Sequence, residues 1–237
     1  MTRDTITKGR LPNAPASVYY IPDFISSEEE QNLINKVLSA PKPKWVHLKN
    51  RRLQNWGGVV VNNAMVAEPL PPWLTSFNPR FRELEVFEGL DPIHKDPNHC
   101  LINEYLPGQG ILPHKDGPAY HPTVATVSLS SHCVLEFFKF SDLSEDRKNQ
   151  EPEFSILVQP RSLLVLKEDV YNHYMHGIRE VHSDNLTEGN ILNLDRAFPP
   201  NNPAPISPLQ RDTRISLTFR IVPKTIRGNR FLAPPKK

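Results

Sequence analysis

The sequence is poor in cysteine and has no long hydrophobic run. Its two cysteines make a disulfide framework unexpected, and both thiols are predicted to be reduced. The densest apolar runs lie near Val59–Val61 and Leu163–Leu166, far short of the ~18 residues that a membrane span requires. The amino terminus shows no apolar segment of the kind that directs secretion. We therefore expect a protein of the nucleus and cytoplasm with no membrane partner.

Glycine is also scarce, whereas proline is abundant. The 237 residues include 10 glycines and 25 prolines. Proline removes a backbone donor and fixes φ, which excludes a helical bundle, a coiled coil or a doubly wound sheet over the whole length. Disorder is excluded as well, because 38% hydrophobic residues can build a sizeable core. This length predicts one domain, or at most two.

Charge is unevenly distributed along the chain. Residues 31–67 carry six bases and no acid, and residues 213–237 carry seven bases and no acid. Residues 68–212 hold twelve bases against twenty-one acids. Trp45 and Trp56 lie among the first group of bases, where they could stack on nucleotides. The pattern favours a nucleic-acid partner, and the alternative is an ordinary solvated surface.

Most of the predicted regular structure is β-strand. Ser26-Ser27-Glu28-Glu29 has the pattern of a capping box that opens a helix ending at Pro41, and Pro71-Pro72-Trp73-Leu74 can open a second helix. Pro41–Trp56 is predicted to be rich in loops. Five runs have strand character: Thr123–Ser130, Cys133–Phe140, Phe154–Val158, Ser162–Lys167 and Thr213–Val222. The fold class is therefore mainly β with flanking helices, in an antiparallel sandwich or jelly roll.

Three His-x-Asp pairs are candidates for metal binding. Two histidines and one carboxylate hold Fe(II) in many oxygenases, and alternate residues of a strand point the same way. His94 and Asp96 lie between prolines, and His182 and Asp184 open a polar segment, so neither pair has a rigid strand to fix its geometry. The pair His114 and Asp116 leads into a predicted strand. The pair is therefore a candidate for metal binding. The alternative interpretation is an ordinary surface histidine beside a solvated aspartate.

The segment RISLTFR alternates strictly in polarity. It places Ile215, Leu217, Phe219 and Ile221 on one face of a strand, and Arg214, Ser216, Thr218 and Arg220 on the other. Two arginines on one face would suit a dicarboxylate that lies along the strand. An exposed surface strand is the alternative.

Three ordered motifs resemble a known family. They are NEYLPGQGILPHKDG, YMHGI and RISLTFR, and they are similar to motifs of the AlkB family of Fe(II)/2-oxoglutarate dioxygenases. The segments KPKWVHLKNRRLQNWGG, PPWL and TVATVSLSSHCVLEF are most similar to the branch called AlkB homologue 6. The resemblance runs over roughly residues 18–222, and it implies a double-stranded β-helix (jelly-roll) core.

The resemblance implies roles for individual residues. His114, Asp116 and His176 would be the iron ligands, with His173 as the nearest rival for the third position. The implied 2-oxoglutarate site consists of Asn103, Tyr105, Arg214, Ser216 and Arg220. In it, Arg214 would hold the distal carboxylate and Arg220 would lie near the metal-bound end. Ser216 departs from the family pattern, because several relatives have Asn there and a hydroxyl offers one donor where an amide offers two.

The chemistry implied is oxidative demethylation. Fe(II), 2-oxoglutarate and O₂ would hydroxylate an N-methyl carbon, and the product would release formaldehyde. The substrate would be an alkylated base in single-stranded RNA or DNA, because a paired base must leave the stack to be reached. Residues 41–58 would form the nucleotide-recognition lid, with these substrate contacts: Lys42, Lys44, Trp45, Lys49, Arg51, Arg52 and Trp56.

The expected organisation is a tail at residues 1–17, a dioxygenase domain at 18–222 with an insertion loop at 180–210, and a basic tail at 223–237. We expect a monomer. Other functions consistent with the sequence are a nucleic-acid reader with little turnover and a protein hydroxylase or demethylase. A zinc hydrolase fits less well, because it would give the paired arginines no task.

Overall fold

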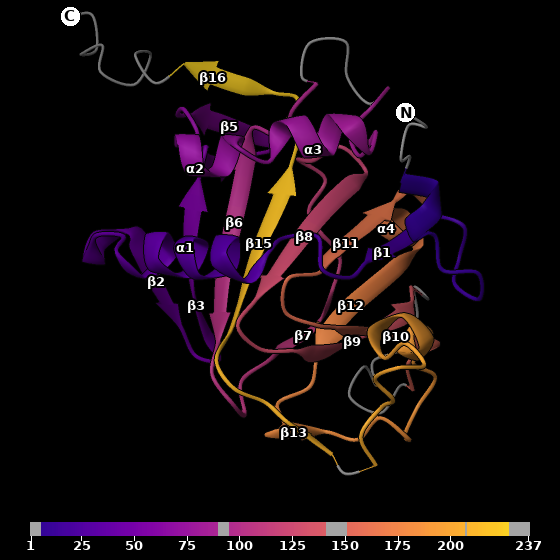
Figure 1. The fold of residues 1–237 in the computed structure, drawn as a ribbon. Helices are drawn as coiled ribbons and strands as arrows, with labels where there is room; N and C mark the ends of the chain where they lie inside the picture. Colours follow the sequence, from indigo (N-terminus) through magenta and orange to yellow (C-terminus); the bar gives the residue numbers. More distant parts are fainter. Residues whose placement is uncertain (1–5, 90–94, 141–150, 207, 228–237) are drawn as a thin grey trace, which may run out of the picture.

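The computed structural model describes residues 6–89, 95–140, 151–206 and 208–227. Two antiparallel sheets face each other across one core and form a jelly roll (Figure 1). The seven-stranded major sheet runs, edge to edge, β1 (Val18–Ile21), β11 (Leu163–Lys167), β8 (Thr123–Leu129), β15 (Arg214–Arg220), β6 (His99–Tyr105), β3 (Arg51–Trp56) and β2 (Trp45–Leu48). The four-stranded minor sheet runs β10 (Phe154–Val158), β9 (Cys133–Lys139), β12 (Tyr174–Ile178) and β7 (Ile111–His114).

Two smaller sheets complete the strands that the structure describes. One contains β16 (Thr225–Arg227), β5 (Ala64–Ala67) and β4 (Gly58–Val61), and the other contains β13 (Ser183–Asp184) and β14 (Leu209–Gln210). The helices are η1 (Ile6–Gly9), α1 (Ser27–Leu38), η2 (Lys42–Lys44), α2 (Pro72–Thr75), α3 (Asn78–Glu83), α4 (Glu168–His173) and α5 (Leu194–Ala197). No helix in the described ranges has the length and apolar character to cross a membrane.

The five predicted strands are confirmed as β8, β9, β10, β11 and β15, within one or two residues at their ends. The predicted capping box is present, because Ser26 Oγ accepts from the Glu29 amide and the Glu29 carboxylate accepts from the Ser26 amide. The prediction of a loop at Pro41–Trp56 is wrong. Beyond the single turn η2, this segment forms the antiparallel hairpin β2–β3, which extends the major sheet past β6.

The major sheet has two different faces. Residues Ile215, Leu217 and Phe219 of β15 point into an apolar core shared with α1, α2 and α3, which cross this side of the sheet (Figure 1). Arg214 and Arg220 point the other way, into a cavity between the two sheets. The alternation predicted for RISLTFR is thus confirmed, and its polar face is buried between the sheets, not exposed to solvent.

Much of the expected amino-terminal tail belongs to the folded body. Residues 1–5 lie outside the described residues, but Leu11 is fully buried in the core between the sheets. Arg10 forms a β-bridge with Tyr19, and the Arg196 guanidinium donates to the Lys8 and Arg10 carbonyls. Apolar burial and these hydrogen bonds hold the segment in place. Its polar composition predicts neither.

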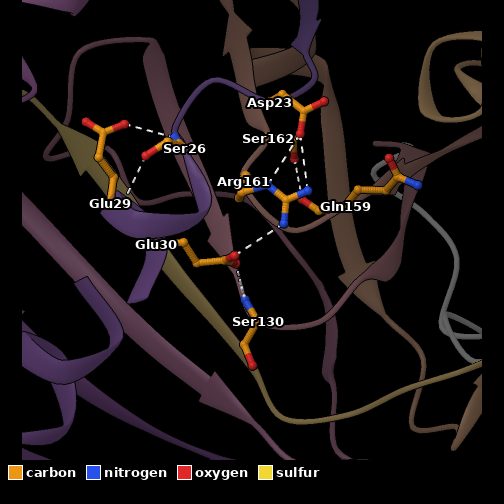
Figure 2. Close-up of polar contacts among 8 residues, drawn as sticks. All are labelled: Asp23, Ser26, Glu29, Glu30, Ser130, Gln159, Arg161 and Ser162. Carbon is orange, nitrogen blue, oxygen red and sulfur yellow. Dashed lines mark hydrogen bonds and ion pairs between the residues drawn. The ribbon is translucent and has the colours of Figure 1, made fainter. Parts of the chain in front are cut away.

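A polar cluster fixes the start of α1 to the turns of the jelly roll (Figure 2). The Glu30 carboxylate accepts from the Ser130 amide at 2.8 Å and pairs with the Arg161 guanidinium at 3.3 Å. Arg161 also pairs with Asp23 at 3.3 Å. Ser130 and Arg161 both have left-handed backbone angles, with φ of 72° and 64°, which cost L-residues energy. Glu30 therefore stabilises two strained turns at once.

We expect Glu30→Ala to lower the free energy of unfolding by about 1–2 kcal/mol, because it removes a charge-assisted hydrogen bond and a partly exposed ion pair. The matched control is Glu28→Ala, in the same turn of α1 but exposed, which should change stability by less than about 0.5 kcal/mol. Urea denaturation measures both. Equal losses for the two variants would contradict the role assigned to Glu30.

Candidate active site

The structure brings His114, Asp116 and His176 together at one end of the cavity. His114 ends β7, and its register partner on the neighbouring strand β12 is His176. Their imidazole centroids lie 4.6 Å apart. Asp116 lies two residues beyond the end of β7. One ligand atom from each of these three side chains lies within 4.8 Å of the other two. Two imidazoles and one carboxylate at this spacing are a donor set suited to Fe(II).

Both histidines are prepared to bind a cation. The Leu112 carbonyl lies 2.9 Å from Nδ1 of His114, which favours a proton on Nδ1 and leaves Nε2 with its lone pair. Burial, with His114 nearby, lowers the pKa of His176 to about 4. His176 is therefore neutral at physiological pH, which is the form that coordinates metal.

Gly110 allows β7 and β12 to approach. A Cβ at this position would lie 2.2 Å from the Ile178 carbonyl oxygen, which is closer than side-chain atoms can come. The register of β7 against β12 shifts between the pairs His176–His114 and Ile178–Ile111. A glycine at the entry of β7 thus fixes the position from which His114 faces His176.

Asp116 is held by Arg220. The Arg220 Nη2 atom donates to Asp116 Oδ1 at 2.7 Å, and both side chains are almost completely buried. Burial alone would raise the pKa of Asp116, but the Arg220 guanidinium keeps it below its usual range. Asp116 is therefore an ionised carboxylate, oriented before any metal binds.

The cavity beside these residues has donors suited to a dicarboxylate. Its volume is about 280 Å³, near the lower end of the range of small-molecule sites. Arg214 is 5% exposed, and its Nη2 donates to Ser128 Oγ at 2.8 Å. Among the described residues, Nε of Arg214 and both Nε and Nη1 of Arg220 are buried and have no hydrogen-bond partner. Because burying an unpaired guanidinium nitrogen is costly, these atoms fit a carboxylate ligand.

The other residues expected to bind 2-oxoglutarate line the same cavity. Asn103 and Tyr105 on β6 are the register partners of Ser216 and Arg214 on β15. Burial raises the pKa of Tyr105, which keeps its hydroxyl protonated and able to donate. All five expected residues thus face one space: Asn103, Tyr105, Arg214, Ser216 and Arg220.

The expected substrate contacts are divided between the two faces of the major sheet. Trp45 and Trp56 pack against the core on the helix side, and the ring of Trp56 meets Trp73 edge to face at 5.6 Å. Arg52 pairs with the buried Glu104 at 2.6 Å and lies over the Trp45 ring. The structure does not bring these three residues to the cavity.

Arg51 and the lysines are placed differently from one another. Arg51 lines the cavity, and its Nε donates to Asn103 Oδ1 at 3.2 Å. Lys49 is exposed in the β2–β3 turn, beside Asn50, whose amide donates to the Glu180 carboxylate. Lys42 is exposed in η2, whereas Lys44 lies over the Trp56 ring at 4.3 Å.

The remaining His-x-Asp candidates have other partners. Asp184 accepts two hydrogen bonds from the Arg211 guanidinium and also contacts His132. Asp96 pairs with Arg82, and His94 lies outside the described residues. His173 ends α4 and does not belong to the metal-binding group found in the described ranges.

Lys115 and Tyr120 were not among the predicted site residues, although both line the cavity. Lys115 is exposed at the rim, where its Nζ lies 4.3 Å from the centre of the Phe140 ring. The Tyr120 ring lies 4.9 Å from the Arg220 guanidinium carbon. The sequence could have indicated both residues, because they lie close to His114 and Asp116 along the chain and neighbours of metal ligands often line the same cavity.

The fold and the site together define a class of protein. A jelly roll that holds two histidines and a carboxylate beside a cavity with buried arginines is the architecture of a non-haem iron oxygenase that takes an acidic cosubstrate. The solved structure of OsALKBH1 has the same fold, with a TM-score of 0.52 and 14% identity over 87% of this chain and 99% of that one.

Sequence comparison identifies the family. The model of the 2OG-Fe(II) oxygenase superfamily matches residues 17–220, so the chain belongs to this family. It is 47% identical over 226 residues to the "Probable RNA/DNA demethylase ALKBH6" of Danio rerio, covering 94% of this chain and 92% of the relative. It is 28% identical to the "tRNA (carboxymethyluridine(34)-5-O)-methyltransferase alkbh8" of Xenopus tropicalis, but spans only 32% of that protein.

The protein is a 2-oxoglutarate-dependent dioxygenase that uses Fe(II), 2-oxoglutarate and O₂, and the expected resemblance to AlkB proteins is confirmed. When bound, iron and 2-oxoglutarate supply the oxidation, in which the cosubstrate becomes succinate and CO₂. The residues fit these ligands, with His114, Asp116 and His176 to hold iron and Arg214 to hold a carboxylate. The chain itself provides orientation, charge and exclusion of water.

Proposed function

We propose that this dioxygenase removes an alkyl group from a base in single-stranded nucleic acid. The observation that carries the proposal is the β2–β3 hairpin, which extends the major sheet past β6 (Figure 1), and β6 lines the cavity. By register, Val46 pairs with Leu53 and Leu53 pairs with Asn103, which lines the cavity. The hairpin therefore extends the cavity face of the sheet.

That face suits a nucleotide. Val46 and Leu48 are 46% and 43% exposed, and their side chains offer apolar contacts to a base. Lys49 and Arg51 lie in and beside the turn, where they can contact phosphate. When one base enters the cavity, the adjacent nucleotides of the strand would lie on this surface. A base can enter in this way only if it is unpaired or flipped out of the stack. The relative from Danio rerio, named as a probable RNA/DNA demethylase, supports the same proposal.

The test is turnover with methylated oligonucleotides. The protein is loaded anaerobically with Fe(II) and 2-oxoglutarate, mixed with single strands that carry one methylated base, and given a pulse of O₂. We expect formaldehyde and succinate in equal amounts, and no formaldehyde from the unmethylated strand. Tight binding without formaldehyde would favour a reader of nucleic acid, and succinate release with methylated peptides alone would favour a protein substrate. Either outcome would overturn the proposal.

A further inference from the structure

The charges that line the cavity are strongly unbalanced. Four cationic side chains surround it, two deep and two nearer the solvent: Arg214, Arg220, Arg51 and Lys115. Among the described residues that line the cavity, Asp116 is the only acid. We propose that the site accepts an uncharged alkylated base and discriminates against a base that carries a positive charge, with Arg51 setting this preference. The inference rests on the nucleic-acid function proposed above.

Asp116 is not available to a cationic base. It already accepts from Arg220 at 2.7 Å, and it lies within the group that would hold iron. A positively charged ring in the cavity would thus meet cations on several sides and no free carboxylate among the described lining residues. Like charges brought together in a poorly hydrated site repel strongly.

Iron and the cosubstrate do not remove the imbalance. The Fe(II) ion contributes two positive charges and 2-oxoglutarate two negative charges, so together they add none. With Asp116 set against the four cations, three positive charges remain around the bound substrate. Arg214 and Arg220 are the most buried of the four cations, each 5% exposed.

Arg51 is the cation best placed to meet the base. It lies on β3 in the hairpin that extends the cavity face, and it is half-buried, whereas Lys115 is exposed at the rim. Its hydrogen bond to Asn103 engages Nε, and the terminal nitrogens of a guanidinium offer four further N–H donors. A carbonyl oxygen or an unsubstituted ring nitrogen of a neutral base can accept from these donors.

Two isomeric bases separate charge from size. Methylation of adenine at N1 gives a ring that is positively charged at neutral pH and has lost the N1 acceptor. Methylation at the exocyclic N6 leaves the ring neutral and keeps that acceptor. The two products have the same composition, so a difference in their binding reports charge and hydrogen bonding, not volume.

The test measures binding without turnover. The protein is loaded anaerobically with Fe(II) and 2-oxoglutarate, and fluorescence anisotropy follows short single strands that carry N6-methyladenine, 1-methyladenine or adenine at one position. We expect the neutral methylated isomer to bind at least about tenfold more tightly than the charged one, because the charged ring meets like charge. Arg51→Gln should reduce this ratio and Arg51→Glu should reduce it further. Arg51→Lys should retain it.

The matched control is Lys36→Glu, an exposed charge reversal on α1 at the helix side of the sheet, which should leave the ratio unchanged. Equal or tighter binding of the charged isomer by the wild-type protein would overturn the inference while demethylation stood. A ratio unaffected by Arg51→Glu, in a variant with wild-type thermal stability, would overturn the role of Arg51. If no strand bound, the nucleic-acid function would itself be overturned.

Discussion

Asp116→Ala is expected to abolish Fe(II) binding and lower turnover more than about 100-fold. The change removes the only carboxylate of the metal-binding group found in the described residues. Loss of a residue that merely orients a metal ligand typically costs 10–100-fold, so loss of a ligand should cost more. The Arg220 charge, 5% exposed, would also lose its partner, and the metal-free protein should be less stable. Anaerobic iron titration and thermal unfolding measure the two effects.

Asp116→Asn separates these two contributions. An amide oxygen can still accept from Arg220 while the negative charge is lost, so stability should fall less than in the alanine variant, and iron affinity should remain poor. The exposed Asp195 on α5 provides a matched control, and Asp195→Ala should bind iron normally. Wild-type iron affinity in either Asp116 variant would refute the assignment of this residue as a ligand.

The second large effect is expected from Arg214→Ala, which should weaken 2-oxoglutarate binding roughly 30-fold or more. Truncating one partner of a buried, hydrogen-bonded charge pair typically costs 2–5 kcal/mol. Arg214 is held by Ser128, and its Nε atom has no partner among the described residues, so a carboxylate would meet an oriented donor. The half-saturating concentration of 2-oxoglutarate measures this effect.

Arg214→Ala should leave iron binding unchanged, because Arg214 is not one of the three ligands. High concentrations of 2-oxoglutarate should restore much of the rate. Arg214→Lys should recover part of the affinity, since an ammonium keeps the charge but not the planar fork. If the variant lost iron as well, or if saturating cosubstrate gave no recovery, the role of Arg214 would be structural.

The sequence predicted the centre of the molecule better than its edges. The strands β8 to β11 and β15 are buried or strictly alternating, and such patterns can be recognised in a single sequence. His114 and Asp116 could be singled out because their spacing fits one side of a strand entering a turn. Placing His176 with them needed the resemblance, since the pairing of β12 with β7 joins residues more than sixty positions apart.

The β2–β3 hairpin was missed because its composition conceals its alternation. Lys42, Pro43 and Lys44 precede the strands. Of the ten residues in the two strands, three are exposed and two more are arginines, and these five are divided between the two sides of the sheet, as an edge hairpin permits. Without the register, nothing separated Arg51 from Arg52. The structure shows that one turns to the cavity and its neighbour to Glu104, because successive strand residues face opposite ways.

The position of β7 has one more consequence. Among the strands described, β7 pairs only with β12, and it is therefore the open edge of the minor sheet, where hydrogen exchange and fraying begin. His114 at its end and His176 on its neighbour would be joined by a shared metal. Metal binding should therefore strengthen the pairing of β7 with β12 and slow the fraying of this edge.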